Sequence, residues 1–305
     1  MDKKLLGKTG FQVSNVSYGG IVSASLYERY AYAGDGQGAS DNFVSWAVER
    51  GVNYFDVAPV YGNAQEIMGN SLKPYRKNIY LACKTNKRKR EEAEKDMETS
   101  MKLLHTDYFD TYQLHGLITM EELEAAFAPD GTMGLLVEMK EKGYTRKLGI
   151  TAHTEDVAIK ALELYDFDSV LFPFNWHMNM VYGMGNRLLK VAKEKNVGVL
   201  CMKSMIERAW DDTQDEEAKL KYPKSWCKPI DEEKDPELLL AALKYAVSLG
   251  VDTIIPPGNF GHFKFAVDHI DQVLSEPLSE HEQKLLSERL KLVKNRPFFE
   301  IRYMH

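Results

Sequence analysis

The sequence predicts a single (β/α)₈ barrel domain that takes up residues 1–305. Short β-branched or aromatic runs alternate with longer segments of helical spacing, and eight such units fit into about 290 residues. Because parallel strands cannot be joined by tight turns, this alternation favours a parallel sheet with helices between its strands. The expected strands cover residues 16–20, 54–57, 79–84, 108–115, 147–151, 169–175, 198–203 and 253–257.

A doubly wound open sheet is the alternative fold. It would carry a G-x-G-x-x-G turn after the first strand, where the phosphates of a dinucleotide bind. Here the pair Gly19-Gly20 runs into residues 21–23 without a third glycine. The sequence therefore favours the closed barrel and excludes dinucleotide binding of the Rossmann type.

The segments around the strands carry boundary signals for the other elements. Residues 5–14 are typical of a β-hairpin with a glycine-containing turn, which would cover the bottom of the barrel. Helix boundaries are marked by Ser40-Asp41 before a run closed by Gly51, by Pro236 with Gly250 at the end, and by the capping box Ser279-x-x-Glu282.

Composition and charge exclude several classes of protein. Hydrophobic residues make up 44% of the chain and charged residues 28%, as in soluble globular proteins. The net charge of −6 lacks the electrostatic footprint of a nucleic-acid binder, so we expect no nucleic-acid partner. The chain has no apolar leader at its start and no run of about 18 uncharged apolar residues. We therefore expect a cytoplasmic protein that does not bind membranes.

The three cysteines indicate reduced thiols. Cys83, Cys201 and Cys227 lie far apart and show no C-x-x-C spacing. An odd number of cysteines at such distances argues against both a disulfide framework and a zinc site. We expect no metal ion.

Four polar residues lie at or just beyond the carboxyl ends of the second, third and fourth expected strands: Asp56, Tyr61, Lys84 and His115. Each alone has an ordinary structural explanation, such as a turn-forming aspartate or a packed tyrosine. In a parallel barrel these strand ends face the same mouth, so the four side chains would meet there. Together they form a candidate set for proton transfer.

The chemistry of such a set is that of a tyrosine acid. The pKa of a free tyrosine is about 10, and the ammonium of Lys84 would lower the pKa of Tyr61. Asp56 would pair with Lys84 and keep it protonated. His115 would hydrogen-bond the same substrate oxygen or relay a proton to Tyr61. None of the four is a reductant, so reduction of a carbonyl needs a separate hydride donor.

The pattern around these residues resembles one known family. It comprises Phe55-Asp56-Val57-Ala58-x-x-Tyr61-Gly62, Glu66, Gly69, Lys84 and Leu114-His115, with further matches at residues 6–10, 13–14, 149–151, 173–175 and 255–258. In these positions the chain is similar to the aldo-keto reductases, in an uncharacterised bacterial-type branch. The resemblance implies a nicotinamide dinucleotide bound in extended form across the mouth. It also implies hydride transfer to an aldehyde or ketone, with Asp56, Tyr61, Lys84 and His115 as the catalytic tetrad and Tyr61 as proton donor.

The resemblance is incomplete around the nicotinamide. The family commonly has Ser-Asn after the fifth strand and Gln in the sixth, where this chain has Ala152-His153 and Leu171. We expect His153 to replace the contact with the carboxamide. In the seventh strand, where a tyrosine often stacks on the nicotinamide, this chain has Met202 followed by Lys203, which could meet a phosphate.

Phosphate recognition is expected from the eighth strand onward. The run Pro257-Gly258-Asn259 would expose backbone amides at a helix start, which is a natural anion site. Lys264 aligns with the basic residue that contacts the 2′-phosphate in NADP-preferring members, so NADP is favoured over NAD. A lysine there also fits an ordinary strand-to-helix turn. Gly19 and Gly20 are expected to contact the cofactor as well.

Residues 207–235 depart from the barrel pattern. The segment is polar and irregular, follows the seventh strand, and contains Trp210 and Trp226. It is either a solvated insertion or a loop that covers the substrate, and its place at the mouth favours the second interpretation. We expect these two tryptophans, with Trp176 after the sixth strand, to bind substrate.

The leading hypothesis is an NADP-dependent reductase of a small carbonyl compound. One alternative is a barrel that binds a nucleotide for a regulatory role. Another is a lyase or isomerase that forms a Schiff base at Lys84, against which Asp56 argues because pairing keeps the lysine protonated. Neither the particular substrate nor the oligomeric state can be deduced from the sequence.

Overall fold

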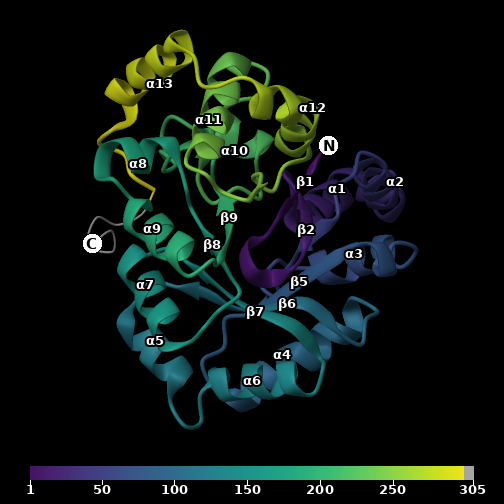
Figure 1. Ribbon diagram of the computed structural model, residues 1–305. Helices are drawn as coiled ribbons and strands as arrows, with labels where there is room; N and C mark the ends of the chain where they lie inside the picture. The colour runs from purple at the N-terminus through teal and green to yellow at the C-terminus, as the bar shows by residue number, and fades with distance from the viewer. Residues whose placement is uncertain (299–305) are drawn as a thin grey trace.

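Eight parallel strands form the central sheet of the computed structural model, which describes residues 1–298 (Figure 1). The two end strands of the sheet meet. The Ser17 amide donates to the Ile254 carbonyl at 2.8 Å, and the Ile254 amide donates to the Asn15 carbonyl at 2.9 Å. The predicted barrel is confirmed. In sheet order its strands are β12 (Thr253–Ile255), β9 (Gly198–Met202), β8 (Ser169–Phe172), β7 (Thr145–Ala152), β6 (Phe109–Leu117), β5 (Tyr80–Thr85), β4 (Tyr54–Asp56) and β3 (Tyr18–Gly19).

Several strands are shorter than the sequence predicts, β3 and β8 by the largest margin. β3 ends at Gly19 because Gly20 already begins the next helix. β8 ends at Phe172 because Pro173 has no amide hydrogen to donate to a neighbouring strand.

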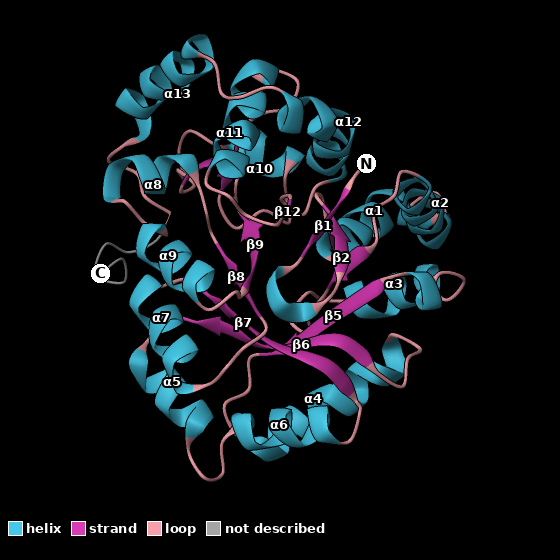
Figure 2. Ribbon diagram, viewed as in Figure 1, coloured by secondary structure: helices cyan, strands magenta, loops and turns pink. Residues whose placement is uncertain are grey.

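Helices surround the strands, as Figure 2 shows. Pro236 stands at the start of its helix, and Ser279 and Glu282 form the predicted capping box. The helix expected from Ser40 begins earlier, at Gly36, where the Gln37 side chain donates to the Asp41 carboxylate. The helices are α1 (Ile21–Ala31), α2 (Gly36–Glu49), α3 (Ala64–Leu72), α4 (Arg90–Leu103), α5 (Met120–Phe127), α6 (Thr132–Glu141), α7 (Glu155–Leu164), α8 (Trp176–Tyr182), α9 (Asn186–Glu194), α10 (Glu216–Lys221), α11 (Pro236–Ser248), α12 (Phe260–Ser275) and α13 (Glu280–Val293). Within residues 1–298, no helix combines the length and the apolar character needed to cross a membrane.

The N-terminal hairpin covers the bottom of the barrel, as predicted. β1 (Lys3–Leu5) pairs antiparallel with β2 (Gln12–Ser14). Phe11 stacks on Tyr80 at the first position of β5, with ring centroids 4.4 Å apart. Gly7 lies against the start of β9, where a Cβ atom on Gly7 would stand 2.2 Å from the Gly198 nitrogen.

The segment after β9 is ordered, which the sequence did not indicate. β10 (Ile206–Arg208) pairs antiparallel with β11 (Lys228–Pro229), and α10 lies between them. Arg208 donates to both carboxylate oxygens of buried Asp215, at 2.6 and 2.8 Å, and Glu207 pairs with Arg289 of α13 at 2.5 Å. The Arg208–Asp215 pair lies within the segment, and the Glu207–Arg289 pair ties the segment to α13. The choice between a solvated insertion and a loop that covers the substrate stays a prediction.

The packing of Gly7 generates a stability prediction. Gly7 and Gly10 both have positive φ, +43° and +78°, but a Cβ on Gly10 would meet no atom within 4 Å. We expect Gly7→Ala to lower the free energy of unfolding by about 1 to 3 kcal/mol more than Gly10→Ala, because only Gly7 is also overpacked. Chemical denaturation of the two variants measures the difference. Equal losses would show that the hairpin does not press against β9.

Candidate active site

The four predicted proton-transfer residues meet at the carboxyl ends of adjacent strands. Asp56 is the last residue of β4, Lys84 lies in β5 and His115 in β6. Tyr61 stands in the turn between β4 and α3, where its amide donates to the Ala58 carbonyl at 3.1 Å. All four predicted residues line one pocket at the mouth of the barrel.

A buried ion pair lies at the centre of this site. The Lys84 ammonium donates to Asp56 Oδ2, and the two side chains are only 1% and 3% exposed. Gln113 Nε2 donates to the other carboxylate oxygen at 3.0 Å. Burial opposes the charge on Lys84, but Asp56 and Tyr61 outweigh it and raise the pKa of the lysine. Lys84 is therefore an ammonium at neutral pH.

Tyr61 lies between Lys84 and His115. Lys84 Nζ is 5.2 Å from the centroid of the tyrosine ring, and the His115 ring meets it edge-on with centroids 5.9 Å apart. Burial raises the pKa of Tyr61, and Asp56 adds to this effect, while Lys84 lowers it. The predicted contribution of Lys84 has the expected sign, but the predicted net lowering is wrong because burial is the larger effect.

His115 is a neutral imidazole. Burial, followed by Lys84, Arg88 and Lys203, lowers its pKa well below the usual value. Its Nδ1 atom is buried without a hydrogen-bond partner among residues 1–298. His115 can therefore offer its other nitrogen, Nε2, to a group in the pocket.

The residues expected around the nicotinamide also lie at the mouth. His153, Met202 and Lys203 all line the pocket, and Lys203 Nζ lies 3.3 Å from His153 Nε2. Burial lowers the pKa of Lys203, while burial, Lys203 and His115 lower that of His153. Lys203 thus donates to His153 Nε2 at the wall of the pocket that Tyr61 also lines.

The glycine pair at the end of the first strand has a packing role. Gly19 and Gly20 are both buried, and neither lines the mouth pocket or the clefts that adjoin it. A Cβ on Gly20 would stand 2.7 Å from a methyl carbon of Val57, and one on Gly19 would stand 3.1 Å from Ile255. The glycines therefore allow close packing of strands, and their expected contact with a cofactor stays a prediction.

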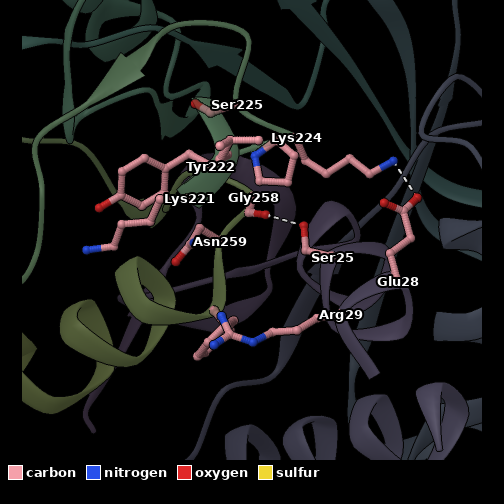
Figure 3. Close-up of a pocket in the computed structure, with 12 residues that line it drawn as sticks. Ser25, Glu28, Arg29, Lys221, Tyr222, Lys224, Ser225, Gly258 and Asn259 are labelled. Atoms are coloured by element: carbon pink, nitrogen blue, oxygen red, sulfur yellow. Dashed lines mark hydrogen bonds and ion pairs between the residues drawn. The ribbon is translucent and has the colours of Figure 1, made fainter. Parts of the chain in front are cut away.

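A second cleft, of about 530 Å³, adjoins the mouth pocket (Figure 3). It runs between α1, residues 220–225 and the start of α12, and shares Lys224, Ser225 and Gly258 with the mouth. Lys224 crosses it to pair with Glu28 of α1 at 2.6 Å. Pro257 and Gly258 line the mouth pocket, and Gly258 and Asn259 line the cleft, where the sequence predicts cofactor contacts.

The start of α12 differs in two respects from the expected anion site. Asn259 Oδ1 accepts hydrogen bonds from the Gly261 and His262 amides at 2.7 and 3.4 Å, so these two donors are already satisfied. Lys264 is exposed, pairs with Asp268 one turn further on, and lines a third groove that shares Asn259 with the cleft.

Of the three tryptophans expected to bind substrate, the structure brings one to the mouth. Trp226 lines the pocket and is 78% exposed. Trp176 is fully buried and donates its indole hydrogen to the Ile206 carbonyl at 3.1 Å, so it supports β10 and cannot touch a substrate. Trp210 lies outside the pocket and donates to the Ser225 carbonyl at 2.8 Å, which positions the segment that carries Trp226.

Other residues of the site were not found from the sequence. Gln113 stands two positions before His115 on β6, and this period of two places both side chains on one face of the strand. The same rule could have found it. The cleft residues Ser25, Glu28 and Arg29 had no such signal, because α1 was not expected to follow the first strand directly.

The site occurs in a chain with clear relatives. A family model with the description "Aldo/keto reductase family" matches residues 39–259 of this chain. The uncharacterized oxidoreductase YqkF of Bacillus subtilis is 27% identical over 189 residues, which cover 57% of this chain and 56% of that protein. The L-galactose dehydrogenase of Arabidopsis thaliana is 27% identical over 218 residues, 66% of this chain and 64% of that protein. Both matches span less than two thirds of the relative.

The fold has solved counterparts. The holo form of aldo-keto reductase AKR11C1 from Bacillus halodurans matches with a TM-score of 0.66 at 22% identity, over 95% of this chain and 96% of that one. The family model covers well over half of the chain and includes all four residues of the predicted tetrad. The predicted resemblance is confirmed, and the chain belongs to the aldo/keto reductase family.

Proposed function

We propose that this protein reduces an aldehyde or ketone to an alcohol with NADPH, and that Tyr61 donates the proton. The observation that carries the proposal is the buried Asp56–Lys84 pair beside Tyr61, with neutral His115 at the edge of the tyrosine ring. The family and the oxidoreductase names of its relatives support a nicotinamide-dependent reaction.

The residues present fit an extended dinucleotide. The mouth pocket, the cleft and the third groove share residues in turn, so one continuous path leads from Tyr61 to the start of α12. Arg29, Lys221 and Lys224 line this path and could bind phosphates. Lys224 now pairs with Glu28 and Lys221 with Asp231 and Glu233, so a phosphate would replace these carboxylates. When bound, the reduced nicotinamide would supply the hydride. His153, Met202 and Lys203 are the side chains proposed to hold its ring.

The chain's own residues would handle the proton. Asp56 holds Lys84 as an ammonium, and that charge stabilises the tyrosinate that Tyr61 becomes as its proton leaves. His115 would donate from Nε2 to the carbonyl oxygen and orient it toward the tyrosine hydroxyl. Tyr61 would then pass its proton to that oxygen.

The alternative chemistry at Lys84 is not supported. A Schiff base requires a neutral amine, and the pairing with Asp56 raises the pKa of this lysine. A small-molecule carbonyl substrate and a location in the cytoplasm remain parts of the proposal.

The first test of the proposal is Tyr61→Phe. We expect it to lower the turnover of aldehydes by about 10² to 10⁴, because the hydroxyl is lost while the ring still packs. Steady-state kinetics and an NADPH titration by nicotinamide fluorescence measure the two effects, with the fully exposed Tyr32→Phe as control. The affinity for NADPH should stay within a few-fold of the wild type. A loss of turnover below tenfold would show that Tyr61 is not the proton donor.

The choice of cofactor is tested at Lys264. If the Lys264 ammonium contacts the 2′-phosphate, Lys264→Ala should weaken the binding of NADPH by about 1 to 3 kcal/mol. The binding of NADH should change much less. Lys284→Ala is a matched control, since Lys284 also pairs one turn along an exposed helix, with Glu288. Equal weakening of both cofactors would show that the 2′-phosphate is recognised by other residues, with Lys203 the next candidate.

The role of the segment after β9 is tested at Trp226. Because this indole lines the mouth and is mostly exposed, a bulky substrate could bury it, which is worth roughly 1.5 to 3 kcal/mol. Trp226→Ala should therefore raise KM for bulky carbonyl compounds while the dissociation constant for NADPH changes little. If NADPH binding collapses and KM holds, the segment clasps the cofactor instead.

A further inference from the structure

The main chain at His115 lacks its regular strand partners. The pairing of β6 with β7 shifts register between Leu114 and Leu117, and Gly116 has φ of +66°. At such a shift the backbone groups must find other hydrogen-bond partners. The Gly116 amide donates to Thr151 Oγ1 at 2.7 Å. The His115 and Gly116 carbonyls both accept from one side chain, Arg88 Nη2, at 2.9 and 3.4 Å.

Arg88 comes from the loop between β5 and α4 and is itself anchored. Its carbonyl accepts the Thr132 amide at 3.1 Å, which ties this loop to the start of α6. The nearest acidic group to its guanidinium is Glu122, 3.8 Å from Nη2. Arg88 Nε and Nη1 are buried and have no hydrogen-bond partner within residues 1–298. The guanidinium therefore makes its hydrogen bonds to the end of β6, and its carboxylate neighbour lies farther away.

The positive charge of Arg88 also affects the pKa of the His115 imidazole. The groups that face His115 are Asp56 and Lys84 from β4 and β5, Tyr61 from the turn, His153 after β7, Lys203 after β9, and Arg88. Arg88 is one of the three cations that, after burial, lower the pKa of His115. A neutral His115 can donate from Nε2 to a carbonyl oxygen without competing with Tyr61 as the acid.

We propose that Arg88 is a positioning residue for His115: its guanidinium binds the His115 and Gly116 carbonyls and fixes the main chain at the end of β6, so that the imidazole is held in place at the mouth. The inference rests on the proposed function, because that function gives His115 its task. Arg88 does not line the mouth pocket, so it acts through His115.

A titration of His115 tests the inference without turnover. The full-length protein, labelled with ¹³C at histidine Cε1, is followed by NMR against pH, and the His115 signal is assigned by its loss in His115→Gln. We expect wild-type His115 to stay neutral throughout the range in which the protein is folded. In Arg88→Met it should begin to titrate within that range, since a nearby positive charge and the contacts that hold the imidazole in place have been removed. Arg90→Met is the matched control, because Arg90 pairs with Glu138 away from the site.

The same variants are assayed for aldehyde reduction across pH. The acid limb of kcat/KM should move to higher pH in Arg88→Met and stay in place in Arg90→Met. The reason is that a protonated His115 competes with Tyr61 as the acid and loses its role as a neutral donor. An unchanged His115 titration in folded Arg88→Met would overturn the inference. That result would leave the proposed function intact, whereas absence of turnover in the wild type would defeat only the proposed function.

Arg88→Lys separates charge from hydrogen bonding and covers the case in which Arg88→Met does not fold. The lysine keeps the charge, so the acid limb should stay at its wild-type position. A single ammonium on a shorter, unbranched side chain does not reproduce the guanidinium bonds to the two carbonyls. We expect kcat to fall about threefold or more. A wild-type kcat in Arg88→Lys would show that the main-chain contacts of Arg88 are dispensable.

Discussion

Lys84 and Asp56 pair where water does not reach, and the chemistry of the site depends on that pair. A buried ammonium without a partner loses several kcal/mol of hydration, so Lys84 stays charged only because Asp56 is beside it. Gln113 occupies the second oxygen of Asp56 and fixes the carboxylate in one orientation. The charge on Lys84 opposes the effect of burial on Tyr61, and it also helps to keep His115 neutral.

The barrel makes this arrangement possible because its strands are parallel and adjacent. Asp56 and Lys84 end up facing one another since β4 and β5 pair directly, and His115 follows on β6. The hairpin at the opposite end closes the barrel from below, and the ionic contacts of residues 207–215 hold the segment that borders the mouth. The strands thus bear Asp56, Lys84 and His115, while Tyr61 and the exposed Trp226 lie on connecting segments.

The sequence was sufficient for the fold and for the tetrad. Both depend on strong local signals, namely β-strand runs separated by capped helices, and polar side chains at strand ends. In a barrel, strands that follow one another in the sequence are also neighbours in space. Burial was harder to predict. Trp176 and Trp210 are large aromatic side chains near the mouth in sequence. Their indole hydrogens, however, bond to the carbonyls of Ile206 and Ser225, and these two residues line the mouth in their place. The pKa of Tyr61 was also harder to predict: Lys84 lowers it, but burial raises it by more, and the sequence does not show the extent of burial. Nothing in the residue pattern indicated the extra helix α1, and so the cleft beside it was missed.

The measurement that tests the central claim most directly is the rate of hydride transfer in Lys84→Met, followed in a single turnover of bound NADPH with an aldehyde at neutral pH. If the charge held by Asp56 is what lets Tyr61 release its proton, the rate should fall by about 10² or more while the NADPH dissociation constant stays within a few-fold. A rate within tenfold of the wild type, in a folded variant that binds NADPH normally, would contradict the account.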